Sequence, residues 1–410
     1  MGVLKKNIRN KLALMWVASA AAVTAVFCQS LVGWVTIRKN RLYSFAPGGW
    51  RRSLSGLPKK TRLAATRPGK ATICDVARVA GVGSMTVSRV LNHHPYVSEA
   101  TAARVRRAIA KLDYSPNDMA RALRGSKVKT IGLIVPFLSD PFYANIAQSI
   151  NQVASSHGYS VLIATSDEDP QKELSEVQIM MRRSIDGLIV APAARGRSRL
   201  AAYPFGEMPL VTLDRLLKGT RFPSVAVENR AGSVLAVRHL IEAHRHQNIA
   251  FVNLRGGVYT LGNRYEGYKK AMSDAGLTPG PQLVCPTQEA MFCLLQKLFC
   301  AARRPTAIFA AHGPAVSKLM HVLARLGISV PHDVAILAFD DWDLFDLIEP
   351  PLTVVRQPVT ELGRISAEML FSLLQADKRT KLSATTTILP VELVLRQSCG
   401  CSPQVSVVSA

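Results

Sequence analysis

The sequence predicts an α/β protein in which an N-terminal helix-turn-helix domain precedes a larger body built on parallel sheets. The first observation is the stretch from Thr72 to Asn92, TICDVARVAGVGSMTVSRVLN, in which two short amphipathic segments flank a glycine-rich turn. The second is the alternation, from Thr130 onward, of short Val- and Ile-rich runs with amphipathic segments, which is typical of parallel sheets covered on both faces. With 410 residues, of which 48% are apolar, the chain is long enough for two or three domains.

Charge divides the chain at the same boundary. Residues 1–129 contain 24 Lys and Arg against four Asp and Glu, a net charge of +20 out of +23 for the whole chain. Residues 130–410 are therefore close to neutral. A positive excess confined to the N-terminal third indicates a polyanionic partner, either nucleic acid or an anionic membrane surface.

Residues 1–69 precede the helix-turn-helix. Leu12–Ile37 contains no charged residue across 26 positions and is flanked by Lys and Arg. Three interpretations stay open for this segment: a transmembrane helix, a secretory signal peptide, or sequence upstream of the true start, with translation beginning near Leu57 or Leu63. In all three cases, residues 40–69 are predicted to be an unstructured basic linker, because they are rich in Arg, Lys, Pro and Gly.

The helix-turn-helix is predicted from apolar spacing. Apolar positions place one helix from Ile73 to Ala80 and a second helix up to Leu91, with Ser84 as the cap of the second. The outward positions of the second helix carry small polar groups, one methionine and one arginine, which suit contacts with base edges and phosphates in a major groove. These positions are Met85, Thr86, Ser88, Arg89 and Asn92. The alternative, a structural hairpin with a solvated polar face, stays open at this point.

A third helix is predicted from Glu99 to Leu112, capped by Ser98, with basic residues facing outward. Those basic residues either lie in solvent or contact phosphates. Tyr114-Ser115-Pro116-Asn117 ends this helix, and a short segment from Asp118 to Arg124 follows.

The body contains eight predicted strands: IGLIVP, YSVLIAT, DGLIVAP, PLVTLD, SVAV, NIAFVN, AIFAA and VAILAFD. Ligands of open α/β sheets bind at the carboxyl ends of strands, so the polar and aromatic residues that follow these runs are candidates for a small-molecule cleft. They are Ser139, Asp140, Phe142, Tyr143, Asp214, Arg215, Arg264, His312, Asp340, Asp341 and Trp342. Each also has an ordinary structural interpretation: Phe142 and Tyr143 as core, Asp214 as a helix cap, and Arg264 as a surface charge.

The chain resembles the LacI/GalR family of bacterial transcription regulators from about Lys70 to Arg396. The resemblance rests on DVARVAGVGSMTVSRVLN, YSPNDMARALRG, TIGLIVPFLSDPFY, DGLIVAP, RPTAIFAA, VPHDVAILAFDD and EPPLTVVRQPVTELG, which occur in the family's order. It implies a helix-turn-helix domain with a hinge helix over residues 70–126. It also implies a two-lobed, periplasmic-binding-protein-like (type I) body over residues 129–398, for effector binding and dimerisation. The chain would cross between the lobes three times, first near 227–229 and then near 353–357.

The resemblance also assigns residues to partners. Leu123 would wedge into a base step of the minor groove from the hinge helix, with Asn117 and Ala120 beside it. The predicted DNA-binding residues are Thr72, Ser84, Met85, Thr86, Ser88, Arg89, Asn92, Asn117, Ala120 and Leu123. The predicted effector-binding residues are Asp140, Phe142, Tyr143, Asp214, Arg264, His312, Asp340 and Gln357.

Three departures from the family pattern put the effector's identity in doubt. His312-Gly313 stands where the family usually has Asn-Asp, Asp140 where asparagine is commoner, and Glu228 where aspartate is commoner. These changes favour a charged ligand, for instance a sugar acid or a phosphorylated sugar.

The predicted function is that of a homodimeric transcription regulator, a repressor, which binds double-stranded operator DNA in the cytoplasm under the control of a small metabolite. Two alternatives stay open: the same regulator tethered to the inner membrane, or an exported solute-binding receptor. A tetramer stays open as an alternative to the dimer. No catalytic motif, cofactor motif or metal site is predicted. The seven cysteines follow no disulfide scaffold, and Cys399-Gly400-Cys401 is interpreted as a frayed tail without nearby histidines.

Overall fold

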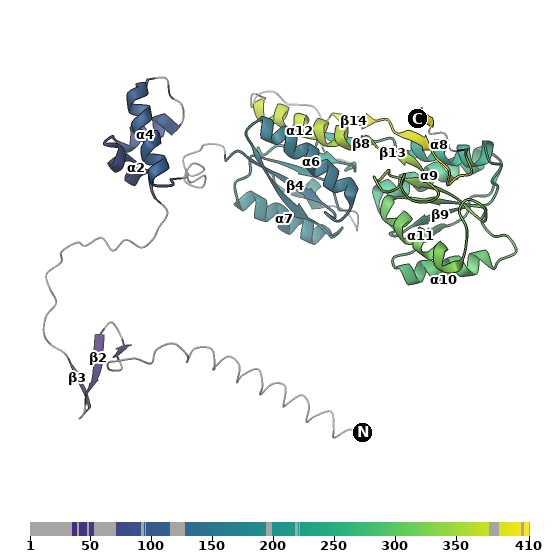
Figure 1. Ribbon diagram of the computed structural model, residues 1–410, viewed down its shortest axis with the longest axis horizontal. Helices are drawn as coiled ribbons and strands as arrows, with labels where there is room; N and C mark the ends of the chain where they lie inside the picture. The colour runs from purple at the N-terminus through teal and green to yellow at the C-terminus, as the bar shows by residue number, and fades with distance from the viewer. Residues whose placement is uncertain are drawn as a thin grey trace. The chain divides into compact units, whose positions relative to one another are not determined.

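The structure is a computed structural model in which the chain divides into two compact units, with the boundary between Ser115 and Pro116 (Figure 1). It describes residues 35–38, 41–46, 49–52, 71–91, 94, 96–114, 128–193, 199–217, 220, 222–376, 385–402 and 406–409. The hinge segment and residues 12–34 of the apolar stretch lie outside these ranges. No helix within the described ranges combines the length and the apolar character needed to cross a membrane.

A small antiparallel sheet lies in the part of the chain ahead of the helix-turn-helix. Its strands are β1 (Val35–Arg38), β2 (Arg41–Ala46) and β3 (Gly49–Arg52), paired in the order β1-β2-β3. Two of these strands fall in the segment 40–69 that was predicted to be unstructured, so that prediction is wrong for residues 41–46 and 49–52. The physical reason is composition: aromatic residues such as Tyr43, Phe45 and Trp50 favour extended backbone even among arginines.

The helix-turn-helix consists of α2 (Ile73–Ala80) and α3 (Ser84–Leu91), as predicted. Thr72 begins α2 with a capping box: its hydroxyl accepts a bond from the Asp75 amide, and the Asp75 carboxylate accepts one from the Thr72 amide. Gly81 ends α2 with φ +64°, a left-handed conformation that glycine adopts without strain. Helix α2 is therefore fixed at both of its ends, by the side chain of Thr72 and by the backbone conformation of Gly81.

Helix α3 differs from the prediction at its first residue. The Gly83 carbonyl accepts bonds from the amides of Thr86 and Val87, so Ser84 is the first helical residue and not the cap. Helix α4 (Glu99–Lys111), capped by Ser98, completes the domain. The three helices share a core of small apolar side chains: Val76, Ala77, Ala80, Val87, Val105 and Ala108.

The body contains two sheets. The six-stranded sheet is entirely parallel, in the order β14-β8-β7-β6-β4-β5. Its strands are β4 (Thr130–Val135), β5 (Ser160–Thr165), β6 (Gly187–Val190), β7 (Leu210–Leu213), β8 (Ser224–Val227) and β14 (Thr386–Leu389). Its helices are α6 (Pro141–Ser156), α7 (Pro170–Arg182), the short 3-10 helix η1 (Arg199–Ala202) and α12 (Val359–Gln375). We call this sheet and these helices the N-terminal lobe.

The seven-stranded sheet has the order β10-β9-β11-β12-β13-β15-β16, parallel as far as β13 and antiparallel beyond it. Its strands are β9 (Ile249–Asn253), β10 (Gln282–Val284), β11 (Ala307–Ala310), β12 (Ala335–Phe339), β13 (Thr353–Arg356), β15 (Glu392–Leu395) and β16 (Ser406–Ser409). Its helices are α8 (Asn229–Glu242), α9 (Tyr259–Asp274), α10 (Gln288–Phe299) and α11 (Gly313–Leu326). We call this sheet and these helices the C-terminal lobe.

Three chain segments connect the lobes. The chain passes from β8 to α8, returns from β13 to α12, and passes again from β14 to β15. The first two lie at the predicted positions near 227–229 and 353–357. In each lobe helices cover both faces of the sheet: α6 and α12 lie opposite α7, and α8 and α9 lie opposite α10 and α11 (Figure 1). The predicted α/β fold class, with its two-lobed body, is confirmed.

Candidate functional site

Helix α3 presents the side chains that were predicted to read DNA. Met85 is 68% exposed, a large value for an apolar side chain, while Val87 on the opposite face is fully buried. Ser84 and Arg89 are exposed, and Thr86 and Ser88 are half-buried. The hydroxyl of Thr72 takes part in the capping box of α2. Asn92, Asn117, Ala120 and Leu123 lie outside the described residues.

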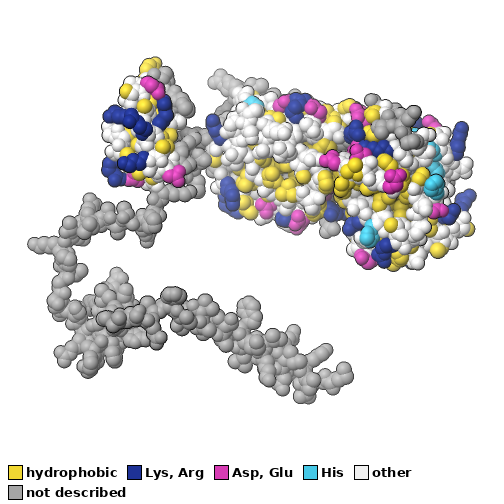
Figure 2. Space-filling view, viewed as in Figure 1, with side chains coloured by type: hydrophobic (Ala, Val, Ile, Leu, Met, Phe, Trp, Pro, Cys, Tyr) yellow, Lys and Arg dark blue, Asp and Glu magenta, His cyan; other side chains and the backbone are white. Residues whose placement is uncertain are grey.

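The helical domain is positive because its basic residues outnumber its acids, and two of those acids are already paired. Asp75 forms an ion pair with Arg78, and Glu99 accepts a hydrogen bond from Arg106 at 2.9 Å. Exposed basic side chains remain on α3 and α4, namely Arg89, Arg104, Arg107 and Lys111. Figure 2 shows Lys and Arg gathered on this domain, whereas they are mixed with Asp and Glu over the body.

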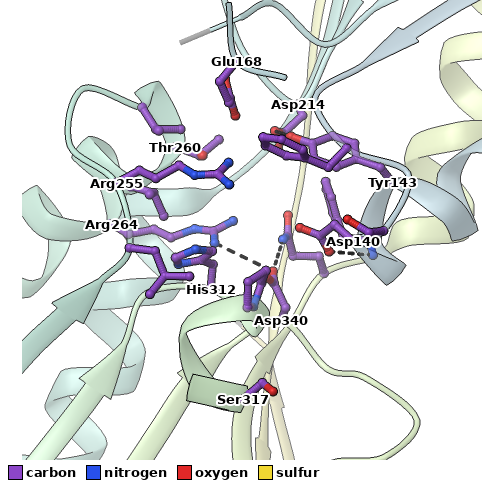
Figure 3. Close-up of a pocket in the computed structure, with 18 of the residues that line it drawn as sticks. Asp140, Tyr143, Glu168, Asp214, Arg255, Thr260, Arg264, His312, Ser317 and Asp340 are labelled. Atoms are coloured by element: carbon purple, nitrogen blue, oxygen red, sulfur yellow. Dashed lines mark hydrogen bonds and ion pairs between the residues drawn. The ribbon is translucent and has the colours of Figure 1, made fainter. Parts of the chain in front are cut away.

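The body contains a cavity of about 340 Å³, lined by residues from both lobes. All eight residues that were predicted to bind an effector line it: Asp140, Phe142, Tyr143, Asp214, Arg264, His312, Asp340 and Gln357. Arg255 and Arg264 extend into it from the C-terminal lobe toward Asp140 and Tyr143 of the N-terminal lobe (Figure 3). Glu228 is half-buried at the start of α8 and does not line this cavity.

A buried charge network forms the N-terminal wall. Arg215 donates from both terminal nitrogens to the Glu168 carboxylate, at 2.7 Å each, and its Nε lies 3.4 Å from Oδ2 of Asp214. The Tyr143 hydroxyl donates to Asp214 at 2.9 Å and accepts from Arg215 at 3.1 Å. Burial raises the pKa of Asp214, and the charge of Arg215 partly offsets that rise.

The C-terminal wall holds its charged groups in the same way. Arg264 Nη1 lies 3.7 Å from Oδ1 of Asp340, its Nε donates to Asn229 at 2.8 Å, and its guanidinium stacks 3.6 Å above the Phe339 ring. Asp340 also accepts a bond from the Gly313 amide at 2.9 Å. These contacts fix the arginine and the carboxylate before any ligand is present, so the wall is preorganised.

Several polar groups of the cavity have no protein partner among the described residues. Nδ1 of His312, Nε1 of Trp342 and Oε1 of Gln357 are buried without a hydrogen bond. Arg255 and Lys318 line the cavity, and neither forms an ion pair within the described ranges. Burial lowers the pKa of His312 to about 3, so this imidazole is neutral at pH 7. The cavity therefore offers hydrogen-bonding groups and two cations to a polar ligand.

Sequence reasoning missed Glu168, Arg255, Thr260, Ser317 and Lys318 among the cavity residues. Glu168 and Arg255 follow the strands β5 and β9 within a few residues, so the strand-end rule could have found them. The other three residues lie near the N-terminal ends of helices α9 and α11: Thr260 on α9, and Ser317 and Lys318 on α11. No local sequence pattern distinguishes them from helix residues that face solvent.

Asp140 gives the body a specific pH dependence. Its carboxylate accepts the Phe142 amide at 3.1 Å as the cap of α6, yet burial raises its pKa to about 7, and the Asp340 charge adds to the rise. The folded state then holds a proton that the unfolded state has lost, so stability falls as the pH rises from about 4 to about 7. An asparagine side chain at this position would cap α6 without a charge to desolvate. We expect Asp140→Asn to leave stability unchanged at pH 4 and to raise it increasingly up to pH 7.

The measurement is urea unfolding of the wild type and of Asp140→Asn at several pH values. Asp343→Asn, at a position outside the cavity, is the control and should keep the wild-type profile. A constant difference between Asp140→Asn and the wild type across this pH range would contradict the raised pKa.

Family models of known proteins match each of the two units. A family model described as bacterial regulatory proteins, lacI family, matches residues 72–117, and a periplasmic binding protein-like domain matches residues 237–399. The chain is 32% identical over 334 residues to the ribose operon repressor of Haemophilus influenzae, covering 80% of this chain and 98% of that protein. It is 33% identical to the HTH-type transcriptional regulator GalR of Escherichia coli, with coverages of 80% and 95%.

Two solved structures extend the comparison. The lac repressor dimer bound to operator and the anti-inducer ONPF matches with a TM-score of 0.72 at 26% identity, over 81% of this chain and 99% of that one. The complex of the transcriptional regulator CelR with cellobiose matches with a TM-score of 0.59 at 28% identity, over 80% and 99%.

Proposed function

This chain belongs to the lacI family of bacterial regulatory proteins, and we propose that it is a repressor whose affinity for operator DNA is controlled by an anionic sugar-like metabolite. The observation that carries the proposal is that one chain combines a DNA-reading type of domain with a body that encloses a cavity. A helix-turn-helix exposes Met85 and Arg89, and a two-lobed body encloses a cavity with preorganised walls. The relatives are regulators as well, so no catalytic role is proposed for the cavity.

DNA reading is assigned to α3. Ser84 and Met85 lie at its N-terminal end, from which side chains reach base edges when such a helix enters a major groove. Met85 suits apolar contact with a thymine methyl, and Arg89, Ser88 and Thr86 suit phosphates. The chain would act as a homodimer on a near-palindromic operator, because two-fold protein symmetry matches two-fold DNA symmetry. Such a regulator works in the cytoplasm, at the nucleoid.

The effector class follows from the charges of the cavity. Glu168 and Asp214 both contact Arg215, and Asp340 contacts Arg264, so each of these acids already has a cation partner within the walls. Arg255 and Lys318 have no such acid within the described residues. A carboxylate or phosphate on the ligand would meet these two cations, while the ring hydroxyls would meet Asp140, His312 and Gln357. This supports a sugar acid or a sugar phosphate.

Control of DNA affinity requires that the effector bind two conformations of the body unequally. The cavity is suited to this because its walls belong to different lobes, which are joined by three chain segments in the part of the chain that the structure describes. A ligand that bridges the lobes favours one arrangement of the lobes over another. The relatives are DNA-binding regulators, which supports the regulator over the exported receptor and the membrane tether.

Two substitutions on α3 test the assignment of DNA contacts. We expect Met85→Ala to cost about 1–3 kcal/mol on the preferred operator and to relax the preference at one base pair. Arg89→Ala should weaken binding to all duplexes alike and reduce the slope of log affinity against log salt by about 1. Fluorescence anisotropy on operator and scrambled duplexes, over a salt series, measures both effects. Arg303→Ala, at an exposed position in the body, should leave both unchanged. Equal losses on operator and scrambled DNA for Met85→Ala would contradict its assignment to base edges.

A further inference from the structure

The C-terminal cysteines lie against the end of helix α8. Cys399 and Cys401 follow strand β15, and His239 and His244 lie in the last turn of α8 and just beyond it. Figure 1 shows α8 and the C-terminal end of the chain side by side in the C-terminal lobe. Cys399 is only 1% exposed, so the interpretation of this segment as a frayed tail without nearby histidines is wrong. Sequence reasoning missed this cluster because no spacing in the sequence indicates that the histidine pair and the cysteine pair, 160 residues apart from His239 to Cys399, point toward one another.

The four side chains bring their donor atoms to a common centre. Nε2 of His239 lies 3.5 Å from both Sγ atoms, and Nε2 of His244 lies 3.3 Å from Sγ of Cys401. One donor atom from each residue lies within 4.8 Å of every other. Zn–S bonds of about 2.3 Å and Zn–N bonds of about 2.0–2.1 Å at tetrahedral angles place sulfur and nitrogen about 3.6 Å apart. The observed separations are therefore close to those of a tetrahedral site before a metal enters.

The local backbone is built to present both thiols on one side. Gly400 has φ +101°, a conformation that side chains other than glycine avoid, and its amide donates to the Gln397 carbonyl at 2.9 Å. A Cβ at Gly400 would lie 3.3 Å from Nδ1 of His244, so the absence of a side chain lets the imidazole approach. The Thr353 hydroxyl donates to Sγ of Cys399 at 3.0 Å and orients it from the neighbouring strand.

The chemistry of the donor set selects the metal. Two thiols and two imidazoles in a tetrahedral arrangement are typical of Zn²⁺, whereas Mg²⁺ and Ca²⁺ require oxygen ligands. No carboxylate belongs to the cluster. The nearby His246 already contacts the Thr306 hydroxyl at 3.0 Å and is not needed as a ligand.

We propose that His239, His244, Cys399 and Cys401 bind one Zn²⁺ as a closed structural site. The metal would join the end of α8 to the segment that follows β15. Both thiols would lose a proton to the solvent as they bind, so no oxidant or reductant takes part. With four protein ligands the site leaves no position for a substrate, which indicates a structural and not a catalytic role.

Cobalt substitution tests this site in the full chain. The reference protein carries Cys74→Ser, Cys293→Ser and Cys300→Ser, which removes the exposed thiols of the described residues as competing ligands. It is kept reduced, treated with a chelator and titrated with Co²⁺. We expect the visible bands of tetrahedral Co²⁺ and a thiolate-to-cobalt charge-transfer band, saturating at one equivalent, with loss of both when Zn²⁺ is added. Cys401→Ser and His244→Asn should each remove most of this signal.

Two controls keep the outcome clear. His332→Asn, outside the cluster, should leave the spectrum unchanged. Circular dichroism identifies any variant that fails to fold. If a variant does not fold, the site is tested instead by alkylation of the reference protein, with and without Zn²⁺. In the reference protein, Zn²⁺ should slow iodoacetamide labelling of Cys401, the less buried of the two thiols, by at least about ten-fold, as judged by peptide mass spectrometry, because metal-bound thiolates are shielded from the reagent. Any of three results would overturn the proposal: no thiolate-to-cobalt band, an unchanged band in Cys401→Ser, or a labelling rate that is the same with and without Zn²⁺. A Cys399–Cys401 disulfide in the reduced preparation would do so as well.

Discussion

Replacing Arg215 with methionine is expected to destabilise the body by about 3–5 kcal/mol, the typical cost of breaking a buried ion pair by removing one partner. The arginine contacts Glu168 through two bonds of 2.7 Å and lies 3.4 Å from Asp214. Its side chain is only 6% exposed, so water cannot replace it. Methionine fills much of the volume but leaves both carboxylates without the cation that they contact. Urea unfolding at pH 7 measures the loss.

Two further variants separate charge from packing. Lys172→Met removes an exposed ion pair with Asp167 on the same lobe and should cost less than about 1 kcal/mol. Combining Arg215→Met with Glu168→Gln should recover part of the loss, because the second change removes the charge that the first leaves behind. A loss below about 1 kcal/mol for Arg215→Met would show that the network does not hold the wall of the cavity together.

Arg255→Ala is expected to weaken binding of the anionic effector by about ten-fold to a hundred-fold, because a hydrogen bond to a charged group contributes about 1.5–3 kcal/mol. Arg255 extends into the cavity with its guanidinium 4.1 Å above the Phe137 ring and without an acid partner in the described residues. Its removal therefore leaves no carboxylate unpaired, and we expect stability to change little. Isothermal titration calorimetry with hexoses, the matching hexuronic acids and hexose phosphates measures the effect.

The comparison between neutral and acidic ligands makes this prediction specific. Any neutral sugar that binds should lose little affinity in Arg255→Ala, while its acid or phosphate should lose most of the advantage that it has in the wild type. Arg303→Ala supplies the control for total charge. Tight binding of a neutral hexose together with no binding of its acid would contradict the anionic class.

The fold was predictable where apolar runs are continuous. All eight predicted strands form, because a strand that is buried on both faces must be apolar throughout, as in β4 and β12. Two of the strands that escaped notice are short or half-exposed. Strand β10 has three residues and β14 alternates between exposed and half-buried positions, so neither has a local signal above that of a loop.

The candidate site was predictable for a topological reason. Parallel strands bring their carboxyl ends to one edge, so residues as distant as Asp140 and Asp340 could be assigned to one cleft. The balance of charge could not be predicted in this way. Arg215 forms two hydrogen bonds to Glu168, whereas Arg255 has no acid partner in the described ranges. This difference depends on the directions of the side chains, which residue spacing does not reveal. The histidine and cysteine cluster was missed for the same reason.

The most direct test of the regulator is selection of bound duplexes from a random DNA library by the full chain, over a salt series and with and without the acidic ligand found by calorimetry. The account predicts one enriched near-palindrome with a flexible central step, lost in Leu123→Ala, whose affinity changes when the ligand is added. The contrary result is binding without sequence preference that disappears at moderate salt and does not change with any ligand. It would mean that DNA is bound only through the positive charge of the N-terminal third, and it would contradict the account.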